Sequence, residues 1–376
     1  MTRPRLLIMS FSDISADARV LKQVTHFADR YDVTTFGYGP IPDSRVQHIQ
    51  LDDSRRIHRW TRRELILRQF RRMYWEQSAI RQAQADLTPL SRFDAILAND
   101  IDTVGLALSL DPVHGVHADI HEYSPRQNEE LLIWRVFEGP YMKWMCRRFL
   151  PRATSMTTVG QGLADEYRRV FGLDAQIVTN ATPYADFDVH QVGRPIRLVH
   201  SGASLRNRRL ETLVDAVAAT STEVSLDLFL MGNDPEYVEE LRARASDRVR
   251  VLDPLPYSEL IGRLNEYDIG LHVIAPTNFN NRWSLPNKFF DYVQARLGLI
   301  IGPSVEMQRL LEEHRLGAVS NDFGARALAK VLDSLTPEEV QSWKANSAAS
   351  AQALSAEAQI VVWDSAIRKL LGDSSS

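Results

Sequence analysis

The sequence predicts an α/β protein built from two doubly wound parallel sheets. Short apolar runs alternate with longer helical patterns, and parallel strands need such crossover helices. A polar segment without clear periodicity, residues 183–195, interrupts this alternation and is typical of a linker. The alternation then restarts, because residues 196–201 lead into a polar loop and a helical pattern just as residues 6–10 do.

The first domain is expected to span residues 1–190. Its strands are predicted at 5–9, 32–36, 94–98, 116–120, 155–159 and 176–179. Its helices are predicted near 17–29, 62–87, 127–149 and 161–171. Ligands of open α/β sheets bind beyond the carboxyl ends of the strands, so the loops after these strands are the places to look for chemistry.

The second domain is expected to span residues 191–353. Its strands are predicted at 196–201, 226–231, 248–252, 269–273 and 298–301. Its helices are predicted near 208–219, 235–244, 257–265, 286–296, 304–313 and 323–333. Residues 354–376 are expected to form a C-terminal helix that packs back on the first domain, with a frayed tail from Gly372 onward. Two such domains in one chain predict a ligand cleft between them.

Composition excludes several classes of protein. The 376 residues carry 44 basic and 48 acidic side chains, and this balance argues against a nucleic-acid partner. The single cysteine, Cys146, excludes an intramolecular disulfide and a cysteine metal cluster, and is expected in the core. No signal-peptide core fits residues 1–13, and no run approaches 18 apolar residues. A cytoplasmic protein is expected, with a peripheral membrane contact left open.

The strongest candidate site is the stretch 284–292. Ser284 is expected to cap a helix, and Pro286 fits its first turn. Helix N-termini bind phosphate, and Ser284, Lys288 and Asp291 have the spacing of one helical face. Lys288 would contact phosphate and Asp291 the hydroxyls of a ribose. The alternative is a capped surface helix with an ordinary Lys/Asp pair.

A second candidate is the loop 201–209 after a predicted strand. Gly202 lets a ligand approach the backbone, and Arg206, Arg208 and Arg209 could clamp phosphate. The alternative is a solvated basic first turn, although cations at a helix start oppose the dipole. The chain has no G-x-x-x-x-G-K-[ST] motif. It also lacks G-x-G-x-x-G after the first strand, which argues against a nicotinamide dehydrogenase.

Two further candidates follow strands of the first domain. His121 could bond a sugar hydroxyl or a reacting oxygen, although a lone histidine near a strand end is more often structural. Asp100 and Asp102 could hold a divalent cation, or Asp102 could cap a helix that begins at Thr103.

Residues 55–75 are strongly basic, with eight arginines against Glu64 over 55–72 and interleaved aromatic side chains. Such a segment can lie on an anionic membrane. Equally, its apolar side can pack on the protein's own sheet and leave a solvated basic face. RNA binding is a weaker third option.

Taken together, these motifs resemble the retaining glycosyltransferases of family 4, which have the GT-B fold. The likeness covers almost the whole chain and rests on the order and spacing of these stretches: 17–20, 98–103, 119–123, 178–181, 201–208, 230–232 and 285–292.

The resemblance implies a role for each matching residue. His121 would lie close to the transferred sugar, while Arg208, with Lys288 as a second cation, would hold the donor diphosphate. Asp291 falls on the second acid of the family's E-x7-E motif, and Pro256 lies where the base is held. The implied donor-binding residues are Gly202, Arg208, Arg209, Gly232, Pro256, Ser284, Leu285, Asn287, Lys288 and Asp291. The implied acceptor-side residues are Ser12, Asp13, Arg19, Asp100, His121 and Glu122.

The resemblance also implies a reaction. A sugar would pass from a UDP- or GDP-linked donor to a polysaccharide, glycolipid or other glycan with retained configuration, and without a metal or other cofactor. The first acid of E-x7-E is Trp283 here, and Ala203 replaces an arginine often found after the first glycine. A non-catalytic nucleotide-sugar-binding subunit and a nucleotide-sugar epimerase are therefore the alternatives.

Overall fold

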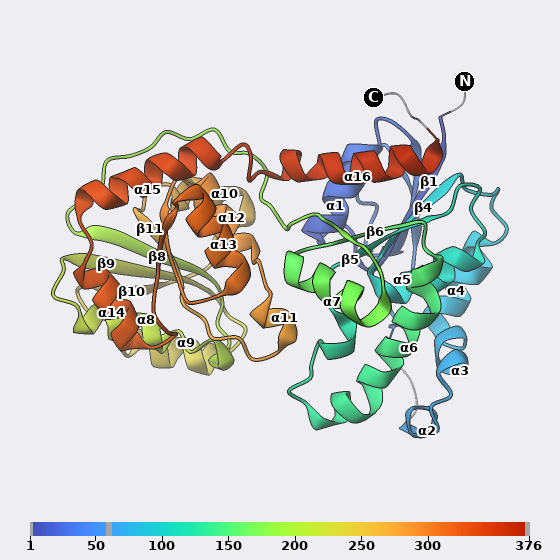
Figure 1. The fold of residues 1–376 in the computed structure, drawn as a ribbon, viewed down its shortest axis with the longest axis horizontal. Helices are drawn as coiled ribbons and strands as arrows, with labels where there is room; N and C mark the ends of the chain where they lie inside the picture. The colour runs from blue at the N-terminus through green and yellow to red at the C-terminus, as the bar shows by residue number, and fades with distance from the viewer. Residues whose placement is uncertain (1–2, 58–61, 373–376) are drawn as a thin grey trace. The chain divides into compact units, whose positions relative to one another are not determined.

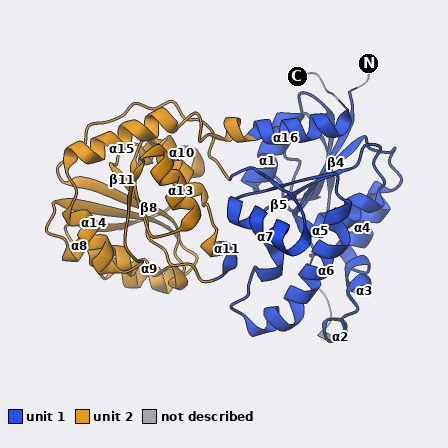
Figure 2. Cartoon of the chain, in the orientation of Figure 1, with its two compact units in different colours: residues 1–179, 278–280, 360–376 blue, residues 180–277, 281–359 orange. Residues whose placement is uncertain are grey.

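The computed structural model describes residues 3–57 and 62–372. It divides into two compact units, drawn in different colours in Figure 2. Unit 1 comprises Met1–Thr179, Asn278–Asn280 and Ile360–Ser376, and unit 2 comprises Asn180–Thr277 and Asn281–Gln359. The first division of the chain therefore falls after Thr179, before the segment expected as a linker.

Unit 1 contains a parallel sheet in the order β3-β2-β1-β4-β5-β6-β7. Its strands are β1 (Arg5–Asp13), β2 (Asp32–Tyr38), β3 (Gln47–Gln50), β4 (Ala95–Asn99), β5 (Val116–Ile120), β6 (Ser155–Thr158) and β7 (Gln176–Ile177). Its helical segments are α1 (Ala18–Phe27), α2 (Arg62–Ile66), α3 (Phe70–Trp75), α4 (Ser78–Leu87), α5 (Asp100–Ser109), η1 (Ser124–Arg126), η2 (Trp134–Glu138), α6 (Gly139–Phe149), η3 (Leu150–Arg152), α7 (Gln161–Phe171) and most of α16 (Ala356–Leu371).

Unit 2 contains a parallel sheet in the order β10-β9-β8-β11-β12-β13. Its strands are β8 (Ile196–Ala203), β9 (Val224–Met231), β10 (Val249–Leu252), β11 (Ile269–His272), β12 (Gly298–Ile301) and β13 (Gly317–Val319). Its helical segments are η4 (Arg206–Arg208), α8 (Glu211–Ala219), α9 (Pro235–Arg242), α10 (Tyr257–Leu264), α12 (Asn287–Gln294), α13 (Val305–His314), α14 (Ala325–Asp333) and α15 (Pro337–Ser350); α11 (Phe279–Arg282) begins in unit 1.

Each unit thus has the Rossmann strand order. Strands are first added on one side of the first strand and then on its other side, so the strand order reverses there. The reversal lies between β1 and β4 in unit 1 and between β8 and β11 in unit 2. The predicted pair of doubly wound parallel sheets is confirmed.

Helices cover both faces of the unit 2 sheet (Figure 1). The face towards α8, α9 and α14 buries a cluster that includes Leu213, Leu241 and Leu328. The face towards α10, α12 and α13 buries a second cluster that includes Phe289 and Leu311. Side chains on both faces are apolar, which is what a sheet covered on both sides requires.

In unit 1 one face of the sheet is covered by α1 and α16 (Figure 1). Leu6 and Ile8 of β1 pack in one cluster with Val20 of α1 and with Trp363 and Ile367 of α16. Helix α1 begins where the Asp17 carboxylate accepts hydrogen bonds from the backbone amides of Arg19 and Val20.

Several sequence predictions require correction. The helix expected over 62–87 is three helices, because Arg68 has a φ of 51° and Gln77 is extended. Strands β3 and β13 and helix α15 were not predicted. Ser284 does not cap α12: the helix begins at Asn287 after Pro286, and the Ser284 hydroxyl donates to the Asn281 carbonyl. Asp102 does not cap a helix at Thr103, because α5 already begins at Asp100.

Part of the predicted basic segment, residues 58–61, lies outside the described residues, as does the predicted frayed tail beyond Gly372. Cys146 is buried and free, as expected. Within the described part of the chain, no helix is both long and apolar enough to cross a membrane.

Candidate functional site

Two cations flank Gly202 at the carboxyl end of β8. The Lys288 Nζ, from the first turn of α12, donates a hydrogen bond of 2.7 Å to the Ser201 carbonyl. A Cβ atom at Gly202 would lie 2.5 Å from that Nζ and 3.6 Å from Nη1 of Arg208. Gly202 also has a φ of 145°, which disfavours side chains. Only glycine therefore lets both cations approach the backbone here.

The structure separates the three arginines of this loop. Arg206 forms ion pairs with Asp234 and Glu240. Arg209 is exposed, and its Nε lies 3.7 Å from a Glu211 oxygen. Arg208 is half-buried, and its guanidinium has no hydrogen bond or ion pair with any residue that the structure describes. Arg208 is therefore the arginine of this loop that is available to an anion.

Burial, and after it the charge of the nearby Arg208, lowers the pKa of Lys288 to about 7, although Asp291 opposes the shift. Burial likewise lowers the pKa of Arg208. In both groups burial disfavours the charged form, so an anion bound beside them would stabilise it.

Two buried histidines, His200 and His272, lie towards the carboxyl ends of the neighbouring strands β8 and β11. Burial, and after it the charge of Lys288, lowers the pKa of both side chains well below the usual value, so they are neutral at pH 7. His200 Nε2 and His272 Nδ1 are buried and have no hydrogen-bond partner among the residues that the structure describes. Sequence reasoning missed this pair, although each histidine stands near the carboxyl end of its strand.

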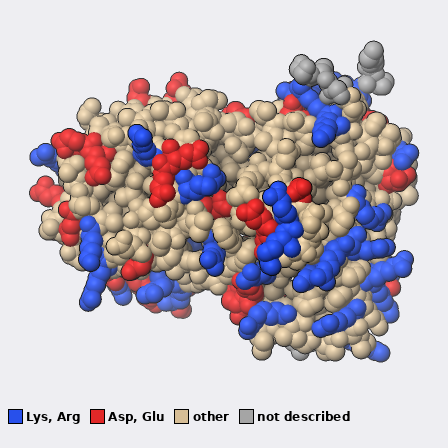
Figure 3. Space-filling model, viewed as in Figure 1, with Lys and Arg blue, Asp and Glu red and all other residues tan. Residues whose placement is uncertain are grey.

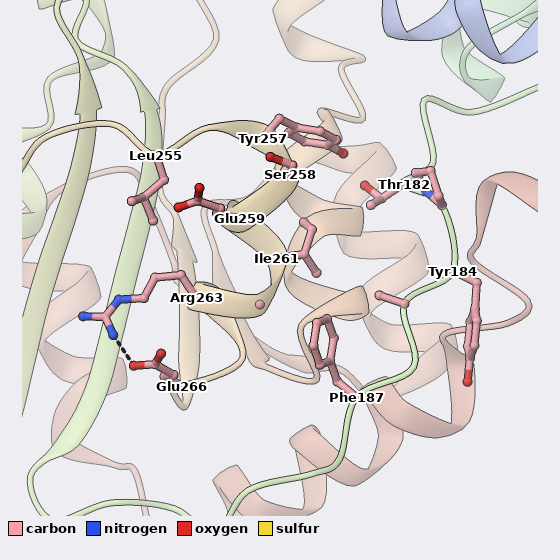
Figure 4. A pocket seen from close by; sticks show the side chains of 13 residues that line it. Thr182, Tyr184, Phe187, Leu255, Tyr257, Ser258, Glu259, Ile261, Arg263 and Glu266 are labelled. Carbon is pink, nitrogen blue, oxygen red and sulfur yellow. Dashed lines mark hydrogen bonds and ion pairs between the residues drawn. The ribbon is translucent and has the colours of Figure 1, made fainter.

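Asp291, one turn after Lys288, is buried. Its Oδ1 accepts hydrogen bonds from the Thr182 hydroxyl at 2.5 Å and from the Tyr257 hydroxyl at 3.2 Å. Thr182 and Tyr257 also line an open pocket of about 580 Å³ between α10 and the 182–187 segment (Figure 4). The pocket includes Leu255 and Phe187, so it offers apolar and aromatic surface beside a carboxylate.

The other predicted donor residues are placed as follows. Gly232 follows β9 and is exposed, with no atom within 4 Å of a Cβ built on it. Pro256 precedes the first turn of α10. Leu285 is buried in the unit 2 core, and Asn287 is exposed at the start of α12.

In unit 1, the buried Asp119 near the end of β5 has several hydrogen-bond partners. It accepts two hydrogen bonds from Arg19, at 2.9 and 2.7 Å, and others from Gln23 and Thr157. Burial alone would raise its pKa, but the Arg19 charge and the nearby His121 hold the pKa well below the usual value. Arg19 also donates to the Val178 carbonyl and is 7% exposed, so its guanidinium is committed to the protein interior.

His121 lies against the Asp119 carboxylate. Its Nε2 is 3.3 Å from Asp119 Oδ2, and its Nδ1 is 3.4 Å from Asp100 Oδ2. Its backbone N–H donates to Asp100 Oδ1 at 3.1 Å. Burial lowers the pKa of His121, but the two carboxylates outweigh burial, so the net direction is upward. Burial raises the pKa of Asp100, which has a φ of 61°.

The remaining acceptor-side residues surround the end of β1 and the segment after β5. Ser12 shares a hydrogen bond of 2.7 Å with the Ser10 hydroxyl, and Asp13 accepts from the Ser15 hydroxyl. Burial raises the pKa of Glu122, and its carbonyl accepts from Tyr167. Across the described ranges, no group of three or more His, Cys, Asp or Glu side chains has the arrangement of a metal site.

No family model matches the chain, and no curated protein does. Several solved structures match it over nearly the whole length of both chains. They include a sucrose-phosphate synthase from Thermosynechococcus elongatus, with a TM-score of 0.71, 16% identity and coverage of 99% of this chain and 100% of that one. HepE of Anabaena, in complex with UDP and glucose, gives 0.69 and 12%, covering 97% and 100%.

A trehalose 6-phosphate synthase from Burkholderia multivorans gives a TM-score of 0.65 with 12% identity, and both chains are covered completely. At these identities the likeness establishes the fold, and the fold is GT-B. The assignment to family 4 and the roles of individual residues stay predictions.

Proposed function

We propose that this protein is a glycosyltransferase that takes a sugar from a nucleotide-sugar donor bound to unit 2. The observation that carries the proposal is the arrangement around Gly202. Arg208 and Lys288 approach one stretch of backbone, and neither has a carboxylate in ion-pair contact among the described residues. The diphosphate of a nucleotide-sugar supplies the missing anionic partner. Structures of HepE with UDP and with UDP-glucose, on the same fold, support this choice.

Other unit 2 residues fit the rest of a nucleotide. Asp291 would accept hydrogen bonds from ribose hydroxyls, in exchange for those it now receives from Thr182 and Tyr257. The pocket beside Tyr257 would take the base. Uridine and guanosine diphosphates are both candidates.

Unit 1 would supply the residues on the acceptor side. Both ring nitrogens of His121 already face carboxylates, so His121 would orient the sugar and contribute positive charge instead of acting as a general base. We propose front-face substitution with retained configuration, as in family 4. Negative charge that grows on the leaving diphosphate would be stabilised by Arg208 and Lys288 without a metal. The acceptor would be a polysaccharide, a glycolipid or another glycan.

The proposal is tested with Arg208→Ala and a matched control, Arg244→Ala, which removes an exposed arginine paired with Asp215. A panel of nucleotide-sugars is screened by thermal shift, because a bound donor raises apparent stability. Hydrolysis of the selected donor then gives a turnover rate. Arg208→Ala is expected to lower turnover at least ~100-fold, and Arg244→Ala to leave it unchanged.

Turnover of Arg208→Ala at the wild-type rate would remove Arg208 from the mechanism. The same assay with EDTA is expected to show unchanged turnover, and a collapse would instead favour a cation at Asp100 and Asp102.

A second candidate function is a non-catalytic nucleotide-sugar-binding subunit. Trp283 favours it, since this side chain stands where the family has its first acid and lies beside the Arg282 guanidinium. Donor binding without hydrolysis or transfer to any acceptor would support this alternative.

A further inference from the structure

An exposed apolar surface lies on unit 1. It consists of the end of α2 and the segment that leads into η2, and we call it the α2–η2 face. Helix α2 packs against η2. Six large aliphatic side chains on the two segments are between 44% and 66% exposed: Ile66, Leu67, Leu131, Leu132, Ile133 and Val136.

These side chains are not the ones that hold the segments in place. Leu65 and Trp134 point inward and are 8% and 7% exposed. The Trp134 indole N–H also donates to the Pro125 carbonyl. Leu65 and Trp134 are therefore the most deeply buried apolar side chains of the two segments, and about half or more of the surface of most of the other six faces solvent. A contiguous exposed apolar patch of this kind marks an interaction site.

Several exposed arginines lie beside the face, together with the exposed Glu130. Arg68, Arg71 and Arg135 are exposed and have no ion pair with any residue in the described part of the chain. Arg72 differs, because Glu76 and Glu64 neutralise it. Figure 3 shows basic side chains gathered over the part of unit 1 that holds α3 and α6, with few acidic side chains among them.

An open pocket of about 1030 Å³ adjoins the face, because Arg68, which follows Leu67, is one of its lining residues. Arg68, Arg71 and Arg72 line it together with Trp75 and Trp144. Arginine binds phosphate by forked hydrogen bonds, and tryptophan favours the boundary between apolar and aqueous regions. This pocket therefore has the chemistry of a site for the phosphate headgroup of a lipid.

We propose that the α2–η2 face docks on an anionic lipid bilayer, with its aliphatic side chains inserted among the acyl chains and the adjacent arginines on the headgroups. Charge complementarity selects this partner, because exposed aliphatic side chains next to Arg68, Arg71 and Arg135 match an anionic interface. This proposal does not depend on nucleotide binding, so it can be tested independently of the proposed function.

Co-sedimentation with vesicles tests the surface, using phosphatidylcholine mixed with phosphatidylglycerol and phosphatidylcholine alone. The full chain is expected to pellet with the mixed vesicles only, and less so at high salt. Leu132→Glu combined with Ile133→Glu is expected to weaken binding at least ~10-fold, since two apolar side chains no longer insert. The matched control is Val361→Glu, a 63% exposed position on α16 of the same unit, which should bind as wild type.

A second pair of variants tests the charges. Arg68→Gln with Arg71→Gln is expected to weaken binding roughly 25-fold, because each arginine near an anionic surface contributes about a factor of five. Arg326→Gln, an exposed arginine of unit 2, is the control.

Wild-type protein that stays in the supernatant with mixed vesicles overturns the proposal, as does binding that the Leu132/Ile133 variant leaves unchanged. Sedimentation velocity without vesicles gives a third outcome. A dimer that this variant converts to monomer, with no vesicle binding, would show a contact between copies of the chain and also overturn it. UDP-glucose binding by the same preparations shows whether the nucleotide site is intact, so the two proposals can fail independently.

Discussion

The charge state of Lys288 is expected to affect both the stability of the fold and the binding of a diphosphate. The Lys288 ammonium is held beside Gly202 by the Ser201 carbonyl, and burial brings its pKa to about 7 from an ordinary 10.5. Between these two values the unfolded chain holds a proton that the folded chain has released. This group therefore makes stability rise with pH across that window, while its burial costs stability below pH 7.

A bound diphosphate should reverse this preference, because an anion stabilises the ammonium form. We therefore expect binding of UDP-glucose to take up a proton above pH 7, and affinity to fall by up to about tenfold for each pH unit above that value. Calorimetric titration on either side of pH 7 measures this, and the diphosphate diester of UDP-glucose does not itself titrate there.

Lys288→Arg is the matched variant, since arginine keeps its charge over the whole range and should flatten the profile. Equal wild-type affinity below and above pH 7 would show that Lys288 does not contact the diphosphate.

At the scale of single residues, the sequence predicted candidate binding residues better than it predicted which side chains they contact. Lys288 and Arg208 could be selected because cations near a glycine loop and a helix start have few structural uses. The partners of Arg19 could not be foreseen, because Asp119 and Val178 lie far from it in the chain and meet it only in the folded sheet. Ser284 was misplaced because Pro286 occupies the capping position that a serine usually takes.

At the scale of elements, the position of α12 depends on close packing against β11. Gly270 lies in the middle of β11, where a Cβ would come within 2.3 Å of the Tyr292 ring. The Tyr292 hydroxyl in turn lies 3.3 Å from the backbone N–H of Ser201, which donates to it, so this contact links α12 to the loop that contains Gly202.

Gly270→Ala is expected to lower the free energy of unfolding by about 1–3 kcal/mol, as overpacking does in other cores. Gly232→Ala is the control for stability, because no atom lies within 4 Å of its Cβ position. Urea unfolding of both variants measures the difference. Equal stability of the two variants would mean that β11 and α12 can move apart to accept the methyl group without a loss in the free energy of unfolding.

Elements with strong periodicity were predicted well, and two of the four edge strands were not. The bounds of β5, β12 and α7 match the predictions, because an apolar run or a helical pattern begins and ends there abruptly. Strand β3 has the sequence Gln-His-Ile-Gln and β13 has only three residues, so neither presents an apolar run. Both lie at edges of their sheets, where pairing on one side suffices without burial on both faces.

At the scale of the whole molecule, the chain leaves unit 1 and returns to it. Trp363 of α16 is 2% exposed and packs with β1 and α1, and the Arg19 guanidinium lies 4.7 Å from its ring centroid. Both ends of the chain therefore belong to the same unit (Figure 2).

Trp363→Ala is expected to destabilise unit 1 by about 3–5 kcal/mol, the usual effect of deleting a buried tryptophan. Val361→Ala, an exposed position two residues earlier, should have little effect. Amide hydrogen exchange resolves the two units: β1 and α1 should lose protection in Trp363→Ala, while β8 and β9 should keep it. Unchanged protection in β1 would show that α16 is dispensable for that sheet.

The return of α16 also sets an order of events during synthesis on the ribosome. Residues 1–179 are translated before unit 2, whereas α16, which shares with α1 the cover of one side of their sheet, is translated after it. Unit 2 takes residues 180–277 and 281–359, so it can fold once these have left the exit tunnel. Until α16 has followed, the apolar side chains of β1 that pack against Trp363 and Ile367 lack this part of their cover.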